Sequence, residues 1–128
     1  MRLLVLVSAA LLACSANPAA PSALGTWGGQ EASLTLSVAG GALDYPCGSG
    51  HIAPGWTLDD TGGFSATGVH YFGGGPVPVP GPTPHPALYA GVVRGDRFDF
   101  TVTVVDLGQT LGPFHMVRGG PPVFLRCL

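Results

Sequence analysis

Two segments of the chain alternate strictly between apolar and polar positions. Residues 33–38 read Ser-Leu-Thr-Leu-Ser-Val, and residues 97–104 carry an apolar side chain at every second position. A period of two is typical of a β-strand with one buried face, because successive side chains of a strand point to opposite sides. The pattern therefore predicts two strands that each turn one face toward a hydrophobic core.

Weaker alternation predicts further strands, and the chain after residue 24 has no helical periodicity. Turns rich in glycine, proline and aspartate separate the predicted strands. About eight short antiparallel strands in succession favour an all-β fold, a small meander β-barrel, with a two-sheet sandwich as the alternative. The weaker strands are predicted at 26–30, 42–47, 64–71, 88–93, 111–117 and 123–128.

The first 13 residues are typical of a cleavable export signal. A single positive charge at Arg2 precedes an apolar run from Leu3 to Ala13. This run is too short for a permanent transmembrane helix, which needs about 20 residues. We therefore expect a signal-peptide helix at 1–13, a flexible tether at 14–24 and a single β domain at 25–128.

The end of the leader, Leu11-Leu12-Ala13-Cys14, resembles the lipobox of bacterial lipoproteins. In those proteins a cysteine that follows a small residue is acylated and becomes the new N-terminus. The resemblance implies that Cys14 carries lipid and anchors an exported protein to a membrane of the bacterial cell envelope. The alternative is ordinary cleavage near Ser15 and Ala16, which would yield a soluble periplasmic or secreted protein.

Cys47 and Cys127 form an even pair in an exported protein, which predicts one disulfide. Cys47 continues the face of a predicted strand that carries Leu43 and Tyr45, and Cys127 continues the apolar face of the last predicted strand. Both sulfurs are then expected to point inward. A bond between them would tie the first third of the domain to its tail and contribute about 4.5 kcal/mol in the chain-entropy model.

Charge and composition exclude one class of partner. The chain has no lysine, and seven acidic residues against five arginines give a formal net charge of −2. Binding to nucleic acid requires clustered positive charge, so we expect no nucleic-acid partner. The glycine-rich segments also lack the Lys-Ser/Thr pair of a phosphate-binding loop, and we expect no cofactor.

Proline occupies every second position from 76 to 86. In an extended segment alternate residues direct their N–H groups to opposite edges, so these six prolines would leave one edge without donors. We predict an edge strand that cannot recruit another strand, or a stiff arm across a barrel mouth. An unpaired surface loop is the alternative.

The histidines are the residues most able to bind a metal ion. They lie at positions 51, 70, 85 and 115, without the close spacing of a helical zinc motif. His51 and His70 are the best candidates for a shared site, because neighbouring strands could hold both. We nevertheless expect no metal site, and solvent-facing or hydrogen-bonded histidines instead.

No catalytic motif stands out. Asp59 and Asp60 precede Thr-Gly-Gly, which predicts a turn rather than a calcium site or an acid–base pair. The serines of residues 63–67 and 48–51 lack the strand-to-helix turn or the orienting acid of a hydrolase nucleophile. We therefore expect a protein that is not an enzyme.

Gly25-Thr26-Trp27 resembles the Gly-x-Trp opening of lipocalins and avidins, which are small barrels of the calycin type. The resemblance implies that Trp27 plugs one end of the barrel. It also implies that a basic residue of the last strand, Arg118 or Arg126, covers this tryptophan. The sequence leaves open whether the interior of the barrel is hollow or filled.

Stretches across the chain are also similar to small bacterial lipoproteins without an assigned function, at 25–29, 47–52, 84–95, 118–122 and 127–128. We expect a monomeric, non-enzymatic envelope lipoprotein that binds a small apolar ligand or a protein partner. The alternatives are an inhibitor or scaffold that presents a rigid loop, and a small hydrolase or metal enzyme. The expected contact residues are Trp56, Tyr71, Val79 and His85.

Overall fold

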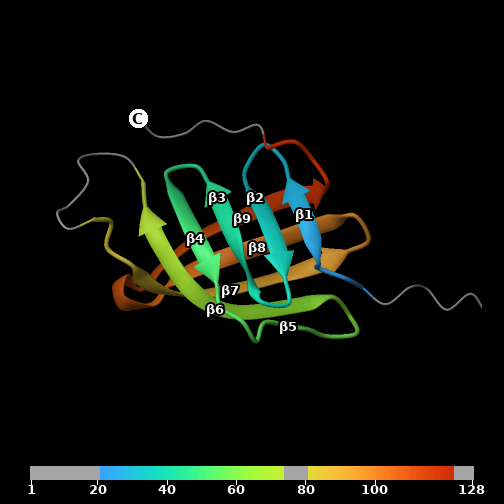
Figure 1. Cartoon of the computed structure of the whole chain (residues 1–128), viewed down its shortest axis with the longest axis horizontal. Coiled ribbons are helices and arrows are strands. Elements are labelled where there is room, and N and C mark those ends of the chain that lie inside the picture. The colour runs from blue at the N-terminus through green and yellow to red at the C-terminus, as the bar shows by residue number, and fades with distance from the viewer. Residues whose placement is uncertain (1–20, 74–80, 123–128) are drawn as a thin grey trace, which may run out of the picture.

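The computed structural model describes residues 21–73 and 81–122, which form an antiparallel sheet of nine strands (Figure 1). The strand order is β4-β3-β2-β1-β9-β8-β7-β6-β5, and β4 also pairs with β6. This extra pairing closes eight strands into a barrel and leaves β5 beside β6. The strands are β1 Gly25–Gly28, β2 Ser33–Ser37, β3 Gly40–Tyr45, β4 Gly48–Ile52, β5 Thr57–Leu58, β6 Gly63–Phe72, β7 His85–Arg94, β8 Arg97–Val104 and β9 Gln109–Arg118.

The closed barrel confirms the predicted all-β meander, and the two-sheet sandwich is wrong. Consecutive strands pair around the barrel except that β4 pairs with β6 instead of β5, and β9 pairs with β1. The part of the chain that the structure describes contains no α-helix, only the three-residue 3-10 helix Val105–Leu107 between β8 and β9. Within the same ranges no helix is long and apolar enough to cross a membrane.

The strands with strict alternation lie where the pattern predicted them. β8 spans Arg97–Val104 and buries its even-numbered side chains, and β2 spans Ser33–Ser37. Two strands, β4 and β5, were not predicted. β4 reads Gly-Ser-Gly-His-Ile, so it has no alternation of apolar and polar side chains to recognise. The side chain of Tyr89 occupies the space beside Gly50, where a Cβ would lie 2.1 Å from the Tyr89 hydroxyl oxygen.

Some predictions fall outside the described residues. The signal peptide, Cys14 and most of the tether lie within 1–20, Val79 lies within 74–80, and the last predicted strand with Arg126 and Cys127 lies within 123–128. Of the proline-rich segment, His85 and Pro86 begin β7, which pairs with β6 there. The disulfide therefore stays a prediction.

The predicted inward orientation of Cys47 is wrong. Leu43 and Tyr45 are both 2% exposed, as the strand phase predicted. The strand ends at Tyr45, however, and Pro46 and Cys47 form an exposed two-residue turn to β4. Proline fixes its own φ near the value that the first position of a turn needs, and Cys47 adopts a left-handed φ of 63°.

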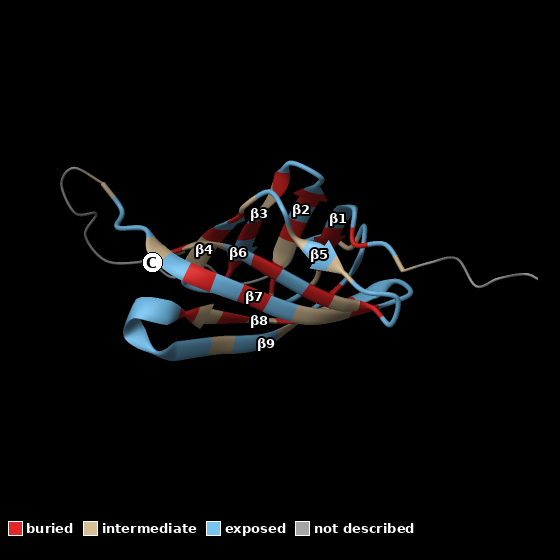
Figure 2. Ribbon diagram, turned by 90° about the horizontal axis from the view of Figure 1, so that it is seen from below, coloured by how far each residue is buried: buried red, intermediate tan, exposed pale blue. Residues whose placement is uncertain are grey.

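The barrel has two distinct ends. The chain enters beside the turns at 38–39, 53–62 and 95–96, and we name this the tether end. The opposite end carries the Pro46–Cys47 turn, the β6–β7 connection and the 3-10 helix, and we name it the far end. In Figure 2 the chain enters at the right, and the β8–β9 connection lies at the left.

Candidate functional site

A continuous column of aromatic rings fills the barrel interior. Its members come from β1, β3, β6, β8 and β9, and consecutive ring centroids are 5.1 to 6.0 Å apart. Such spacings and the edge or stacked orientations are favourable for aromatic pairs. The interior along this column is therefore packed rather than hollow. From the tether end to the far end the rings are Trp27, Phe98, Phe100, Phe114, Tyr45 and His70.

Trp27 closes the column at the tether end. Its side chain is buried, and its Nε1 donates to the carbonyl of Ala23 at 2.8 Å. Arg118 lies directly opposite on β9, with its guanidinium carbon 4.2 Å from the centre of the indole. The same guanidinium donates to the carbonyls of Leu24 at 3.1 Å and Ser22 at 2.7 Å. Arg118 thus covers the Trp27 indole and also binds the entering chain.

His70 lies at the other end of the column and is completely buried. Its Nδ1 shares a short hydrogen bond with the hydroxyl of Tyr45, and the two rings stack. Its Nε2 has no hydrogen-bond partner among the described residues. Burial lowers the pKa of His70, and the neighbouring His85 adds to this effect. His70 is therefore held as a neutral imidazole.

The tyrosines beside His70 are also held neutral. Burial raises the pKa of Tyr45 and raises that of Tyr89 to about 12. The hydroxyl of Tyr89 donates to the carbonyl of Val69 at 2.6 Å. These groups form a buried polar layer beneath the far end, which specifies the packing of β3, β6 and β7.

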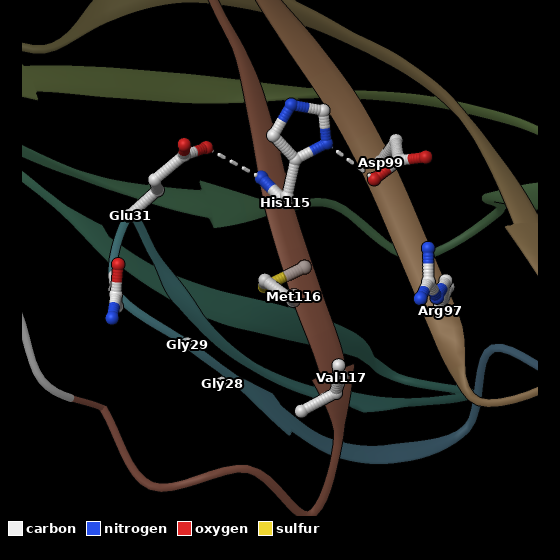
Figure 3. A pocket seen from close by; sticks show the side chains of 9 residues that line it. Gly28, Gly29, Glu31, Arg97, Asp99, His115, Met116 and Val117 are labelled. Atoms are coloured by element: carbon white, nitrogen blue, oxygen red, sulfur yellow. Dashed lines mark hydrogen bonds and ion pairs between the residues drawn. The ribbon is translucent and has the colours of Figure 1, made fainter.

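A groove of about 460 Å³ lies on the outer wall of the barrel (Figure 3). It opens where β1 ends: only Trp27 and Gly28 of β1 pair with β9, and β9 continues beyond them. A Cβ on Gly29 would lie 3.0 Å from the carbonyl oxygen of His115, so the segment after β1 passes close to β9. The groove is lined by Gly28, Gly29, Gln30, Glu31, Arg97, Asp99, His115, Met116 and Val117.

Two carboxylates hold His115 in the middle of this groove. Asp99 and His115 are direct cross-strand partners on β8 and β9, and Asp99 Oδ1 lies 2.6 Å from His115 Nδ1. The backbone N–H of His115 donates to Glu31 Oε2 at 2.8 Å. The hydrogen bond to Asp99 raises the pKa of His115. The groove therefore carries a histidine that gains charge readily, two carboxylates and the exposed guanidinium of Arg97.

The predicted contact residues do not gather in one place. Trp56 is half-buried at the tether end, where its Nε1 donates to the carbonyl of Ser37 at 2.7 Å. Tyr71 and His85 lie toward the far end, and His85 Nδ1 is 2.8 Å from Asp106 Oδ2. Val79 lies outside the described residues. No described member of this set lines the groove.

The candidate metal and turn residues have separate structural roles. β4 and β6 are neighbours, but His70 is opposite Gly50 and buried, whereas His51 is exposed. Within residues 21–73 and 81–122 no group of three potential ligands could hold a metal ion. The turn predicted at Asp59 is confirmed, since its Oδ1 accepts from the backbone of Thr61 at 2.9 Å and of Gly63 at 2.8 Å. These bonds, with that from the Thr61 hydroxyl, lower the pKa of Asp59.

The serine motifs lie within strands. Ser49 is in β4 and Ser65 is in β6, and among the described residues the side-chain hydrogen bonds of the histidines go to Tyr45, Asp99 and Asp106. Within residues 21–73 and 81–122 no hydrogen bond joins the side chain of either serine to a histidine.

Sequence reasoning missed the groove. His115 was considered only as a possible metal ligand, and Glu31, Asp99 and Arg97 were not singled out. The register of β8 on β9 places Asp99 opposite His115 and Arg97 opposite Val117. The alternation of apolar and polar residues does not reveal this register. Comparisons with family models, with curated proteins and with solved structures found no match for this chain.

Proposed function

We propose that this protein is a non-enzymatic lipoprotein of the bacterial envelope whose barrel binds a protein partner through its outer wall. The observation that carries the proposal is the aromatic column, which occupies the interior where a calycin-type barrel would hold a small ligand. A groove of about 460 Å³ lies instead on the outside, between the segment after β1 and the β8–β9 pair.

The chemistry of the groove suits the polar surface of another protein. Glu31, Asp99 and His115 are held by hydrogen bonds to one another, so their charged atoms are positioned before a partner arrives. Arg97 adds an exposed donor of the kind enriched at protein interfaces. Val117, which is 48% exposed, supplies apolar area at the same place.

The anchor and the disulfide complete the proposal. The lipobox-like end of the leader supports acylation of Cys14, and the pairing of Cys47 with Cys127 follows from their even number in an exported chain. Cys47 is exposed in a turn at the far end of the barrel. The disulfide would then be a surface tie rather than part of the core.

Mass spectrometry of the membrane-purified protein tests the covalent part. We expect a chain that begins at an acylated Cys14, with a mass two hydrogens below that of the reduced form. A Cys14→Ala variant should lose the membrane fraction. A wild-type chain that begins at Ala16 and remains soluble would contradict the anchor.

Site-specific photocrosslinking tests the binding surface. A photoreactive side chain at Val117, in the groove, should crosslink to one protein in envelope preparations. The same group at Leu88, which is 48% exposed on β7, provides the matched control and should not form this product. The product should disappear in the His115→Ser background. A small molecule that co-purifies with the barrel in native mass spectrometry, with no crosslink at Val117, would favour ligand binding instead.

A further inference from the structure

The point at which the N-terminal tether meets the barrel is fixed by hydrogen bonds. Arg118 donates to the carbonyls of Ser22 and Leu24, and Trp27 donates to that of Ala23. Arg118 Nε also lies 3.3 Å from Asp96 Oδ1 in the β7–β8 turn. Residues 22–24 are therefore held against the tether end.

The part of the chain between Cys14 and Ser22 is short compared with the barrel. Seven residues separate Cys14 from Ser22. As a flexible chain this segment spans about 16 Å on average, and at most about 28 Å when fully extended. A strand of the length of β7 spans about 33 Å. A lipid on Cys14 would therefore keep the tether end close to the bilayer and the far end away from it.

Apolar side chains are exposed around the point of entry. Val38, at the tip of the β2–β3 turn, is 78% exposed, and Leu24 is 43% exposed. The half-buried indole of Trp56 lies beside the same turn, bound to Ser37. Exposed apolar and aromatic side chains of this kind insert readily at the level of lipid headgroups.

The arginines of the described chain, like these exposed apolar side chains, lie at the tether end. Arg94 and Arg97 flank the β7–β8 turn as cross-strand partners, and Arg118 ends β9 beside it, so all three arginines of the described chain lie at the tether end. Three acidic residues also lie there: Asp96 pairs with Arg118, Asp59 is bound within its own turn, and Asp60 beside it is exposed. The described part of the far end has acidic residues, Asp44 and Asp106, without an arginine.

We propose that the tether end rests on the phospholipid headgroups of the membrane that holds the Cys14 lipid. Val38, Leu24 and Trp56 contact the interface, and Arg94 binds a phosphate group. The far end then points away from the bilayer, and the groove on the side wall faces laterally. This inference rests on the proposed lipid anchor, and it determines the directions from which a protein partner can approach.

Hydrogen exchange on vesicles tests the orientation independently of acylation in the cell. Residues 15–128 with a hexahistidine tag in place of Cys14 are bound to phosphatidylcholine–phosphatidylglycerol vesicles that contain a nickel-chelating lipid. We expect exchange in 36–41 and 94–97 to slow at least about twofold relative to the free protein, with no change in 45–49 and 105–109. Slowing confined to the far end, or equal slowing at both ends, would overturn the proposal.

Matched variants separate contact from anchoring. Val38→Ser combined with Arg94→Gln should abolish the slowing at the tether end while the tag still holds the protein on the vesicle. Val105→Ser with Leu107→Ser changes side chains that are 49% and 55% exposed at the far end, and should leave the slowing intact. Retained slowing in the first variant would contradict the assigned contacts. Absence of acylated Cys14 from cells would contradict the anchor alone.

Discussion

The guanidinium of Arg118 lies over the indole of Trp27 and also binds the two carbonyls on either side of Ala23. One side chain thus connects the last strand, the first strand and the chain that enters the barrel. Removal of a charged donor from a main-chain carbonyl that it binds lowers the free energy of unfolding, because the carbonyl is left without a hydrogen-bond partner. This contact therefore matters for stability at the tether end and for the path of the tether.

Replacement of Arg118 by methionine tests this role. Methionine retains apolar cover for Trp27 but removes both hydrogen bonds and the cation–π contact, so we expect the free energy of unfolding to fall by about 2 kcal/mol. Urea unfolding followed by tryptophan fluorescence provides the measurement. Arg94→Met, an exposed arginine on the same end, should change stability by less than about 0.5 kcal/mol. Equal effects of the two substitutions would contradict the structural role of Arg118.

Trp56 was predicted from the sequence to contact a ligand or partner, and the structure gives it a hydrogen bond within the protein. Trp56→Phe keeps a ring against Phe64, whose centroid is 5.8 Å away, but removes the N–H that binds the Ser37 carbonyl. We expect a loss of about 1 kcal/mol of unfolding free energy. Tyr71→Phe is the control, because no hydrogen bond of the described chain uses the Tyr71 hydroxyl. If Trp56→Phe leaves the free energy of unfolding unchanged, the hydrogen bond from Trp56 to Ser37 does not stabilise the fold. The indole N–H of the wild-type Trp56 is then available for a partner.

Gly48 begins β4 at the buried polar layer. A Cβ there would lie 2.7 Å from Cε2 of Tyr45 and 2.8 Å from Cε1 of His70. Both rings are fixed in the column, so Gly48→Ala should force a shift in the core and lower the free energy of unfolding by about 1 to 3 kcal/mol. Denaturant unfolding of this variant is compared with that of Ser49→Ala on the same strand. A Gly48→Ala protein as stable as the control would show that the layer adapts to the added methyl group.

The extent to which the sequence predicted the fold follows from the chemistry of individual strands. β8 and β2 were located because their apolar positions alternate, and the turn at Asp59 because aspartate binds its own backbone there. β4 was missed, since a strand in which glycines make room for Tyr89 and His70 has no apolar face to recognise. Hydrophobic periodicity reveals a strand when the strand's own apolar side chains are buried. It gives no signal where a side chain from a neighbouring strand fills the space beside a glycine.

Two further features depend on contacts that a linear pattern does not contain. Cys47 was assigned to a strand by extension of the phase of Leu43 and Tyr45, whereas Pro46 starts a turn that interrupts this phase. The groove depends on the pairing of Asp99 with His115, and the register of β8 on β9 changes between Phe100 and Val102 through an irregularity. A shift of one residue exchanges the two faces of a strand, so side-chain pairs cannot be derived without the register.

The pH dependence of stability provides the sharpest test of the buried layer. Burial lowers the pKa of His70 in the folded protein, so the unfolded chain takes up a proton there near pH 6.5 while the folded protein does not. The free energy of unfolding should therefore decrease as the pH falls below about 6.5, with a limiting slope of about 1.4 kcal/mol per pH unit for one proton. His115 acts in the opposite sense: its pKa is raised, so its contribution is present in acid and is lost as the pH rises through the folded value.

Urea unfolding at about pH 5 and about pH 7.5 separates these contributions. We expect His70→Gln to reduce the loss of stability in acid and His115→Gln to increase it. The effect of His115 should be the smaller of the two, because its side chain is 58% exposed and its pairing with Asp99 is screened by solvent. Ser49→Ala on β4 removes no titrating group and is the control for the effect of a substitution as such. If His70→Gln loses as much stability in acid as the wild type, the buried neutral imidazole is not the cause of the acid sensitivity. The folded protein would then accommodate a protonated His70.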